Sequence, residues 1–378
     1  MIDVIVPVYR GLDTTRRCLE SVLRSGARTP FELVVVDDAT PEPSVAQYLD
    51  GKARSGLITL LRNDVNRGFA AAVNLGMSLH GERDVVLLNS DTEVANDWLG
   101  RLRAAAARDP RIATVTPFSN NATICTYPFD GWTRGMPGEL SLAALDSLVA
   151  KANPGATVDL PTAVGFCMYI RRECLRQVGL FDATRFGRGY GEENDFCLRA
   201  AAVGWRHVLA ADVFVFHEGA VSFAERRATL SEKATEALQE VHPGYVELVR
   251  VFVERDPIAA YRSAIDLARA GHGQAELRHV LGERVMERRE VIANLMAAQR
   301  LADERAQRIE EATHALRHAE ELVAARDAEL RDVLAEIERL RAGLAHAEAL
   351  ALGRGAVLER ICRTWVGRWI AHRSRAEV

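Results

Sequence analysis

The stretch Val85-Val86-Leu87-Leu88-Asn89-Ser90-Asp91-Thr92-Glu93 decides how the rest of the chain is interpreted. Its four consecutive branched apolar residues are typical of a strand that is buried on both faces, as in a parallel sheet. The strand runs directly into a polar cluster that contains Asp91. Open α/β sheets bind ligands at the carboxyl ends of their strands, so Asp91 is a candidate ligand-binding residue. A helix N-cap or turn role for Asp91 is the alternative that this stretch alone leaves open.

The composition is that of a globular protein, and it excludes several classes. The 378 residues are enough for one large domain with an extension, or for two domains. Hydrophobic residues make up 48% and charged residues 26%, and the net charge of −4 gives no basic field that would favour nucleic acid. The sequence has no basic, apolar leader and no run of about 18 apolar residues. We therefore expect neither a secreted nor a bilayer-spanning segment.

The six cysteines show no metal-binding or redox pattern. None of them forms a Cys-x-x-Cys pair, and several lie inside apolar runs. Such residues are typical of reduced cysteines in the core of a cytoplasmic protein.

Strand-like and helix-like segments alternate along the first part of the chain. Helix-like periodicity covers residues 12–25, 70–79 and 98–107. Strands that alternate with helices predict crossover units, and hence an α/β fold with a mostly parallel sheet and helices on both faces. The strand-like runs cover residues 2–8, 31–36, 57–61, 85–88, 163–170 and 212–216.

Polar residues gather where the first strands end. Pro7 and Tyr9 close the first strand in a turn that lacks the Gly-x-Gly-x-x-Gly of dinucleotide-binding folds. Asp37 and Asp38 end the second strand, and a carboxylate accepts hydrogen bonds from a base or a ribose. Arg67 precedes a helix and can pair with a diphosphate. Each residue alone is more often a loop residue, but their shared location favours a nucleotide site.

A second polar cluster covers residues 187–199. Its glycines favour a mobile loop, and Glu192, Glu193 and Asp195 begin a helix, whose dipole favours negative charge there. Capping accounts for one or two of these acids. Repulsion among three acids raises at least one pKa, as a general base requires, so Glu192, Glu193 and Asp195 are all candidate catalytic residues.

One histidine follows the apolar run at residues 212–216. Such a histidine, here His217, is usually satisfied by hydrogen bonds within the fold, and this alternative stays open. Opposite Asp91, its imidazole would instead serve as a metal ligand.

Taken in order, these motifs resemble a family 2 glycosyltransferase of the GT-A fold over about residues 1–222. Each motif is moderately specific, and six in the family's order are strongly specific. The matching motifs are Ile5–Tyr9, Val36–Asp38, Asn66–Asn74, Asn89–Asp91, Glu192–Asp195 and His217.

The resemblance implies a nucleotide-binding role for several of these residues. Pro7, Tyr9 and Asp38 would hold the base, and Arg67 would lie on the nucleotide side. Asn89, which stands where many members carry Asp, would contact the ribose. This departure affects the fine donor specificity more than the activity.

The resemblance also implies the catalytic groups. Asp91 and His217 would bind a divalent metal, Mn²⁺ or Mg²⁺, across the donor diphosphate. Glu193 would be the catalytic base where many members carry Asp, and Glu192 is the alternative base. A hydroxyl is a weak nucleophile, and a nucleoside diphosphate is a poor leaving group without a cation. One base and no second nucleophile imply a single displacement with inversion.

The implied donor is a UDP- or dTDP-sugar that supplies a hexosyl or deoxyhexosyl group. The implied acceptor is a hydroxyl of a glycan or of a lipid-linked sugar, as in polysaccharide biosynthesis. The alternative is a coiled-coil interaction or scaffold protein whose nucleotide-binding domain is inactive. The presence of Asp91, Glu193 and His217 favours the enzyme.

Beyond the first 222 residues the pattern is helical. We expect a helical extension over residues 223–284 and a coiled coil over residues 285–350. Apolar residues recur every seven positions from Leu295 to Leu344, and a second set follows three residues later, interrupted by two arginines. The repeat predicts self-association, with an intramolecular hairpin or a lone helix as the alternatives.

The last segment, residues 351–378, is basic and amphipathic. It carries Trp365 and Trp369 on one helical face. Such a helix can lie on an anionic membrane, which predicts peripheral contact at the inner membrane face, where a lipid-linked acceptor would be found. Docking on the protein or on a partner is an equal alternative.

Overall fold

The computed structural model describes residues 1–129, 132, 135–187, 191–219, 227–349, 360, 363–366 and 368. Side chains at residues 227–233 and 344–349 are outside this description. The chain forms two compact units, Met1–Arg289 and Glu290–Val378. The segment 223–284, expected as an extension, therefore belongs to the same compact unit as the sheet.

The first unit is built around an eight-stranded sheet of order β3-β2-β1-β4-β8-β6-β9-β7. Strands β3, β2, β1 and β4 pair in parallel, and so do β6 and β9, whereas β8 and β7 run antiparallel to their neighbours. The strands are β1 Ile2–Val8, β2 Phe31–Asp37, β3 Thr59–Arg62, β4 Asp84–Leu88, β6 Ile112–Phe118, β7 Thr157–Leu160, β8 Cys167–Ile170 and β9 Arg206–Phe214, with the separate pair β5 Thr92–Glu93 and β10 Phe216–His217.

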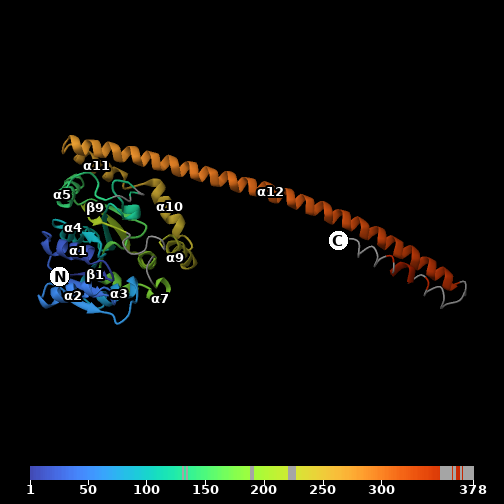
Figure 1. The fold of residues 1–378 in the computed structure, drawn as a ribbon, viewed down its shortest axis with the longest axis horizontal. Helices are drawn as coiled ribbons and strands as arrows, with labels where there is room; N and C mark the ends of the chain where they lie inside the picture. The colour runs from blue at the N-terminus through green and yellow to red at the C-terminus, as the bar shows by residue number, and fades with distance from the viewer. Residues whose placement is uncertain are drawn as a thin grey trace. The chain divides into compact units, whose positions relative to one another are not determined.

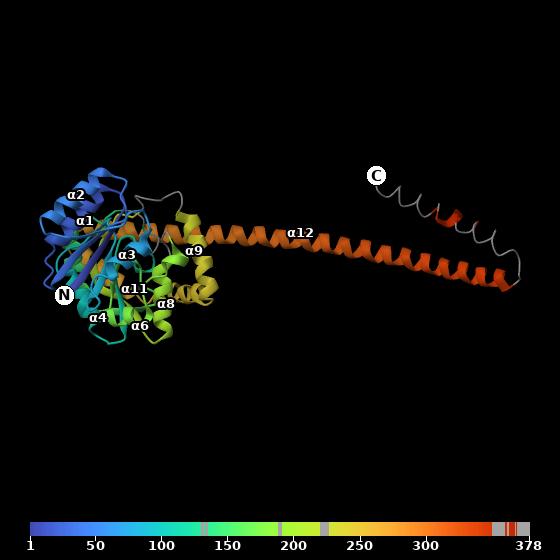
Figure 2. The ribbon, with the colours of Figure 1, turned by 90° about the horizontal axis from the view of Figure 1, so that it is seen from below.

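Helices cover both faces of this sheet (Figures 1 and 2). The arrangement confirms the predicted α/β class with a mostly parallel sheet, followed by a long helix. The helices are α1 Leu12–Arg24, α2 Pro43–Arg54, α3 Phe69–Met77, α4 Trp98–Ala106, α5 Leu142–Ala152, α6 Arg172–Val178, α7 Ala183–Phe186, α8 Glu192–Ala202, α9 Arg227–Val241, α10 Tyr245–Arg255, α11 Ala259–Ala270 and α12 Gln274–Ala349, with a short 3-10 helix at Thr123–Cys125.

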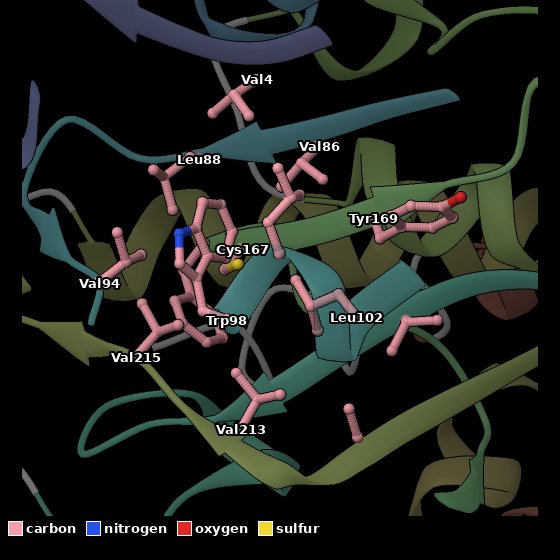
Figure 3. Packing of buried hydrophobic residues seen from close by; sticks show 14 of the residues in the cluster. Val4, Val86, Leu88, Val94, Trp98, Leu102, Cys167, Tyr169, Val213 and Val215 are labelled. Carbon is pink, nitrogen blue, oxygen red and sulfur yellow. The ribbon is translucent and has the colours of Figure 1, made fainter. Parts of the chain in front are cut away.

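The buried strand β4 explains why both faces need cover. Successive side chains of a strand point to opposite faces. Val86 and Leu88 join the apolar cluster that contains Trp98 of α4, which Figure 3 shows from close by. Val85 and Leu87 join the opposite cluster, which includes residues of α3, α6 and α8. The apolar run therefore forms a central strand, as its sequence predicts.

Several features differ from the expectation. The run 212–216 is divided between the end of β9, which begins at Arg206, and β10, and strand β6 was not among the expected runs. The apolar run 163–170 becomes a strand only from Cys167, and that strand is antiparallel. The residues just before it form a turn that includes Gly165. Strand β7 and helix α2 were not predicted, because their short stretches have mixed polar and apolar residues without a clear period.

A buried ion network ties α11 and the start of α12 to the sheet unit. Arg269, which is 0% exposed, pairs with Glu276 at 2.9 Å and with Glu283 at 2.6 Å. Its Nη1 also donates to the hydroxyl of Tyr127 at 3.0 Å, and that hydroxyl lies 2.8 Å from Asp266. A buried arginine is tolerated only when it is paired in this way, so removing one partner would destabilise the unit strongly. The unit thus extends to about residue 289.

In the second unit, α12 runs on as one uninterrupted helix to Ala349. Its large apolar side chains are exposed in the single chain, among them Leu295, Ile309, Leu316 and Leu330. Among the described residues, no helix combines the length and the apolar character needed to cross a bilayer. Coiled-coil pairing stays a prediction. Most of the tail 351–378, including Trp369, lies outside the described residues.

Candidate active site

The candidate site lies at the carboxyl edge of the parallel strands. Strand β1 pairs in parallel with β2 on one side and with β4 on the other. The order in which successive strands are added to the sheet therefore reverses at β1. Such a switch point opens a crevice at the strand ends. The ends of these three strands bring Tyr9, Asp37, Asp38 and Asn89 to one edge of the sheet.

Asp38 holds the loop that carries Arg67. Its buried carboxylate accepts hydrogen bonds from Asn63 Nδ2 at 2.7 Å and from the backbone N–H groups of Arg67 and Gly68, both at 2.9 Å. Gly68 has a φ of 85°, which a residue with a side chain rarely adopts. The side chain of Arg67 is exposed at this edge. In this structure Asp38 positions the loop rather than offering a free acceptor.

Asp37 and Tyr9 occupy neighbouring positions with different exposure. The carboxylate of Asp37 is buried and accepts from Arg62 Nε at 2.9 Å and from the backbone N–H of Thr40 at 2.8 Å. Tyr9 is half-buried, and the guanidinium of Arg10 lies 5.3 Å from its ring centroid. Pro7 is half-buried as well, opposite a residue of β2. The ring of Tyr9 is therefore the more accessible surface of this group.

Asn89 is anchored through its backbone. Its N–H donates to the carbonyl of Phe166 at 2.8 Å, and its own carbonyl accepts from the Thr92 hydroxyl at 2.7 Å. These bonds fix the turn that leads from β4 to Asp91. The side chain of Asn89 is half-buried at the strand edge.

Asp91 and His217 meet across the small β5–β10 ladder, in which His217 lies opposite Thr92. The Nε2 atom of His217 lies 3.4 Å from Oδ1 of Asp91, and the two side chains are 11% and 21% exposed. The sequence left it open whether His217 lies opposite Asp91. The structure brings the two together.

Two contacts hold the imidazole ring of His217, and a third holds its backbone. Its Nδ1 lies 2.7 Å from the carbonyl oxygen of Asn121, and its ring stacks on Phe166 with centroids 5.2 Å apart. The amide of Asn120 binds both the backbone N–H and the backbone carbonyl of His217, at 2.8 and 2.9 Å. This support fixes both the position and the orientation of the ring.

The donor set fits a divalent cation. Because a carbonyl can only accept, Nδ1 of His217 carries a proton, and in the neutral ring Nε2 presents its lone pair towards Asp91. Two ligands about 2.1 Å from one octahedral ion lie about 3 Å apart, so the observed 3.4 Å needs little movement. A histidine and a carboxylate both suit Mn²⁺.

Electrostatics keep Asp91 in the ionised form that a cation needs. Burial acts to raise the pKa of Asp91. When His217 is in the imidazolium form, its charge and its Nε2–H hydrogen bond, together with backbone hydrogen bonds, outweigh burial and lower the pKa of Asp91 below its usual range. An ionised carboxylate is the metal-binding form.

Another cluster of metal-type side chains lies away from this edge, near the start of β1. Asp3, Glu32 and His80 have ligand atoms within 4.8 Å of one another. Arg83 already supplies a cation to this group, since it contacts Asp3 at 3.0 Å and Glu32 at 2.6 Å. The cluster is an ion-pair network, and it does not compete with the pair at the strand ends.

The acid cluster lies at the start of α8, behind Gly191, whose φ is 96°. Glu192 is 4% exposed, and its Oε2 has no hydrogen-bond partner among the described residues. Burial, and then the charge of Glu193, raise the pKa of Glu192 well above its usual range. Burial also raises the pKa of Glu193, whose Oε2 is likewise without a partner in the described part of the chain. Both side chains thus resemble groups that are poised to exchange a proton.

Asp195 differs from the two glutamates. Its carboxylate is buried and binds Arg199 Nε at 2.8 Å and His242 Nε2 at 2.9 Å. Arg199 in turn donates to the carbonyls of Val178 and Leu180. The structure therefore places Asp195 in a network that fixes α8, and its predicted catalytic role is untested.

Residues 165 and 166 connect the two clusters. Phe166 receives the Asn89 N–H through its carbonyl and the His217 ring through its own ring. At Gly165, an added Cβ would lie 3.7 Å from the Cδ of Glu193, so the Glu193 side chain passes directly beside this backbone. One candidate metal ligand, His217, and the candidate base thus pack on adjacent residues of one turn.

The helices after residue 227 complete this region, which the sequence pattern alone scarcely indicated. His242 binds Asp195, and Leu238 is buried against Gly191. Burial, followed by the charge of Glu193, raises the pKa of Tyr245 to about 12, while a hydrogen bond with Thr162 opposes the shift. In the sequence, the sign of this role was His242, a polar residue that lies between two helical stretches.

Comparison with known proteins finds a family match over residues 3–179 of the chain. The matching model is described as "Glycosyl transferase family 2". Succinoglycan biosynthesis protein ExoO of Rhizobium meliloti is 32% identical over 155 residues, which cover 40% of this chain and 41% of that protein. Glycosyltransferase AglE of Haloferax volcanii is 21% identical over 217 residues, which cover 57% and 66%.

A third relative carries a different label. Inactive polypeptide N-acetylgalactosaminyltransferase-like protein 5 of Macaca fascicularis is 25% identical over 267 residues, which cover 66% of this chain and 57% of that protein. The chain spans from 25% to 66% of the length of the curated relatives it matches. Among solved structures, the mannosyltransferase PcManGT from Pyrobaculum calidifontis, in complex with GDP-Man and Mn²⁺, is 20% identical with a TM-score of 0.47, covering 75% of this chain and 79% of that one.

Proposed function

We propose that this chain, whose residues 3–179 form a family 2 glycosyl transferase domain, moves a sugar from a nucleoside-diphosphate donor to an acceptor hydroxyl with inversion. The observation that carries the proposal is the turn at residues 165–166: the ring of His217, which lies beside Asp91, stacks on Phe166, and the side chain of Glu193 passes beside Gly165. A single displacement needs the attacking hydroxyl and the leaving diphosphate to be held in one site.

On the acceptor side, Glu193 removes the proton of the attacking hydroxyl. A hydroxyl attacks efficiently only as its proton leaves. The base works best when its pKa lies near the working pH, which for a glutamate means a pKa above its usual value. Burial raises the pKa of Glu193 in this direction. Glu192 is the more deeply buried of the two, and burial and the charge of Glu193 both raise its pKa, so it serves better as the neutral neighbour than as the base. Without a second nucleophile, one displacement inverts the anomeric centre.

On the donor side, Asp91 and His217 hold a divalent cation, Mn²⁺ or Mg²⁺. When bound, the cation neutralises charge that develops on the leaving diphosphate. Arg67, on the loop fixed by Asp38, supplies a further positive charge on the nucleotide side. Tyr9 offers its ring to the base, and Asn89 lies where a ribose contact is expected.

The donor and acceptor classes are part of the proposal. We infer a UDP- or dTDP-sugar as donor, supplying a hexosyl or deoxyhexosyl group. The acceptor would be a hydroxyl of a glycan or a lipid-linked sugar in polysaccharide biosynthesis, a proposal supported by the name of the 32% identical relative, a succinoglycan biosynthesis protein. A panel of nucleotide sugars, measured by calorimetry with Mn²⁺ present, identifies the donor. Equal affinity for the sugars and for free UDP would speak against sugar recognition.

The second candidate function is a scaffold whose nucleotide-binding domain is inactive. The relative that is labelled inactive keeps this candidate open. The two candidates separate in a nucleotide-sugar hydrolysis assay with and without Mn²⁺. Turnover that requires Mn²⁺ supports the enzyme, whereas binding without turnover across the donor panel supports the scaffold.

The proposed place of work is the cytoplasm, with peripheral contact at the inner membrane face through residues 353–378. The six arginines of this segment would face anionic headgroups, and its tryptophans would enter the interface. Flotation with vesicles that contain anionic lipid tests the contact. Equal flotation of the full chain and of a chain that ends at residue 352 would exclude it.

A further inference from the structure

The second unit leaves a long apolar stripe in water. Between Leu295 and Leu330, the side chains of one stripe are 55–67% exposed, which a stable helix of this length would be expected to cover. The stripe follows a seven-residue spacing, so it lies along one face of a slightly supercoiled helix. The stripe residues are Leu295, Ala302, Ile309, Leu316, Val323, Leu330 and Ile337.

The second row of the seam differs from the first in size and charge. It lies three residues further along and has an alanine at three positions and an arginine at two. Large side chains thus fill the first row except at Ala302, and small or basic ones fill the second row up to Arg326. The row comprises Ala298, Arg305, Ala312, Ala319, Arg326, Val333 and Leu340.

This asymmetry disfavours a parallel pair. In a parallel coiled coil each seam residue faces its own copy. Arg305 would then meet Arg305, and Arg326 would meet Arg326, with like charges close together in the seam. Ala298, Ala312 and Ala319 would face alanines and leave space unfilled, which costs packing energy.

An antiparallel pair sets one row against the other. We propose that residues 295–340 pair with a second copy of this chain in antiparallel orientation. Each alanine then faces a large side chain, and each arginine faces an apolar one along which its aliphatic stem can lie. The facing pairs are Leu316 with Ala319, Val323 with Ala312, Ile337 with Ala298, Ala302 with Val333, Leu330 with Arg305, and Ile309 with Arg326 of the second copy.

Charges beside the seam select this register. The pairing brings Arg308 next to Glu329 of the second copy, twice per dimer because the dimer is symmetric. Glu329 already contacts Arg326 of its own helix at 2.9 Å, so it would lie between two guanidinium groups. A shift of one heptad in one direction faces Arg308 with Leu322. A shift in the other direction faces Arg308 with Glu336, but it also places Glu320 opposite Glu320, a repulsive pair.

Cysteine cross-linking tests the orientation. In the proposed pair, residue 302 lies beside residue 333 of the second copy, and the two copies of residue 302 lie about 45 Å apart, from 1.5 Å per residue. The full chain with Cys362→Ser is a suitable background, since its other cysteines are buried. Ala302→Cys and Val333→Cys are made in separate chains, mixed and oxidised. We expect a cross-linked dimer from the mixture and none from either chain alone.

A charge exchange tests the register. Arg308→Glu or Glu329→Arg should weaken dimerisation about tenfold in sedimentation, because two attractive pairs become repulsive. The double exchange should restore it, and Arg300→Glu, on the outer face, is the matched control. Self-cross-linking of Ala302→Cys alone, a monomeric parent chain, or equal loss in the single and double exchanges would each overturn the proposal. None of these results bears on sugar transfer.

Discussion

Nε2 of His217 lies 3.4 Å from Oδ1 of Asp91, while Nδ1 of the same ring lies 2.7 Å from the carbonyl oxygen of Asn121. The ring is therefore oriented from behind, with its free nitrogen towards the carboxylate. Two residues 126 positions apart in the chain, counted from 91 to 217, are brought together by the β5–β10 ladder. This arrangement motivates the first two predictions.

Asp91→Ala should abolish Mn²⁺-dependent donor binding. The variant removes the one carboxylate that faces His217, so the diphosphate loses its bridge to the protein. Calorimetric titration of donor with and without Mn²⁺ measures the effect, and Glu82→Gln, an exposed acid elsewhere, is the control. An unchanged Mn²⁺-dependent affinity in Asp91→Ala would remove this residue from the metal site.

Asn120→Ala should weaken Mn²⁺ binding by roughly 10- to 100-fold without touching a ligand, the usual effect of losing an outer support. The amide of Asn120 holds both backbone groups of His217, so its loss frees the segment that carries the ring. Paramagnetic Mn²⁺ titration provides the measurement. Affinity equal to that of the parent would show that the stack on Phe166 suffices to orient the histidine.

Glu193→Gln should lower turnover by roughly 10²- to 10⁴-fold while donor affinity stays nearly constant, because the shape is kept and the proton acceptor is lost. Burial raises the pKa of Glu193, and a base acts only when deprotonated. Activity of the parent should therefore fall as the pH drops, at a pH above the value of about 4.3 where an ordinary glutamate titrates. Full activity in Glu193→Gln with loss in Glu192→Gln would move the base by one residue.

Glu192→Gln should stabilise the fold at neutral and alkaline pH. The pKa of Glu192 is raised in the fold by burial and by Glu193, so the folded state binds this proton more tightly than the unfolded chain does. As the pH rises from the unfolded pKa through the folded one, that stability is lost. The neutral amide of Glu192→Gln does not undergo this loss. Above the folded pKa, the free energy of unfolding of the variant should therefore exceed that of the parent by roughly 1 to 3 kcal/mol, the usual cost of an unsatisfied buried group. Thermal melts from pH 4 to pH 9 should converge at the acid end, and a constant difference would contradict this account.

A chain that ends after Arg289 should keep donor binding, and one that ends at residue 222 should not. The shorter chain lacks the hydrogen bond between His242 and Asp195, and it lacks the packing of Leu238 against the start of α8. An end at Gly282 is also unsuitable, because it removes Glu283 from the buried Arg269. Donor titration and thermal melts of both chains measure the difference. Equal donor affinity and equal melting temperatures would show that the helices after residue 227 play no part in the site.

The apolar runs were enough to predict several central strands, because a strand buried on both faces needs uninterrupted branched residues, as Val85 to Leu88 show. The motifs could be recognised because they follow these runs. The pairing of Asp91 with His217 was anticipated as an option, since both follow strands. The direction of β8 was not predictable, because a buried run has the same pattern in both directions. Nor was the contact of His242 with Asp195, which depends on how helices far along the chain return to the sheet.

The central claim is that Asp91, His217 and Glu193 form one site for sugar transfer. The most direct test is turnover of a nucleotide-sugar panel by the full chain with and without Mn²⁺, beside Asp91→Ala and Glu193→Gln. The account predicts turnover that requires Mn²⁺, with donor binding lost in Asp91→Ala and retained without turnover in Glu193→Gln. Turnover that persists without a metal, or that survives in both variants, would contradict it.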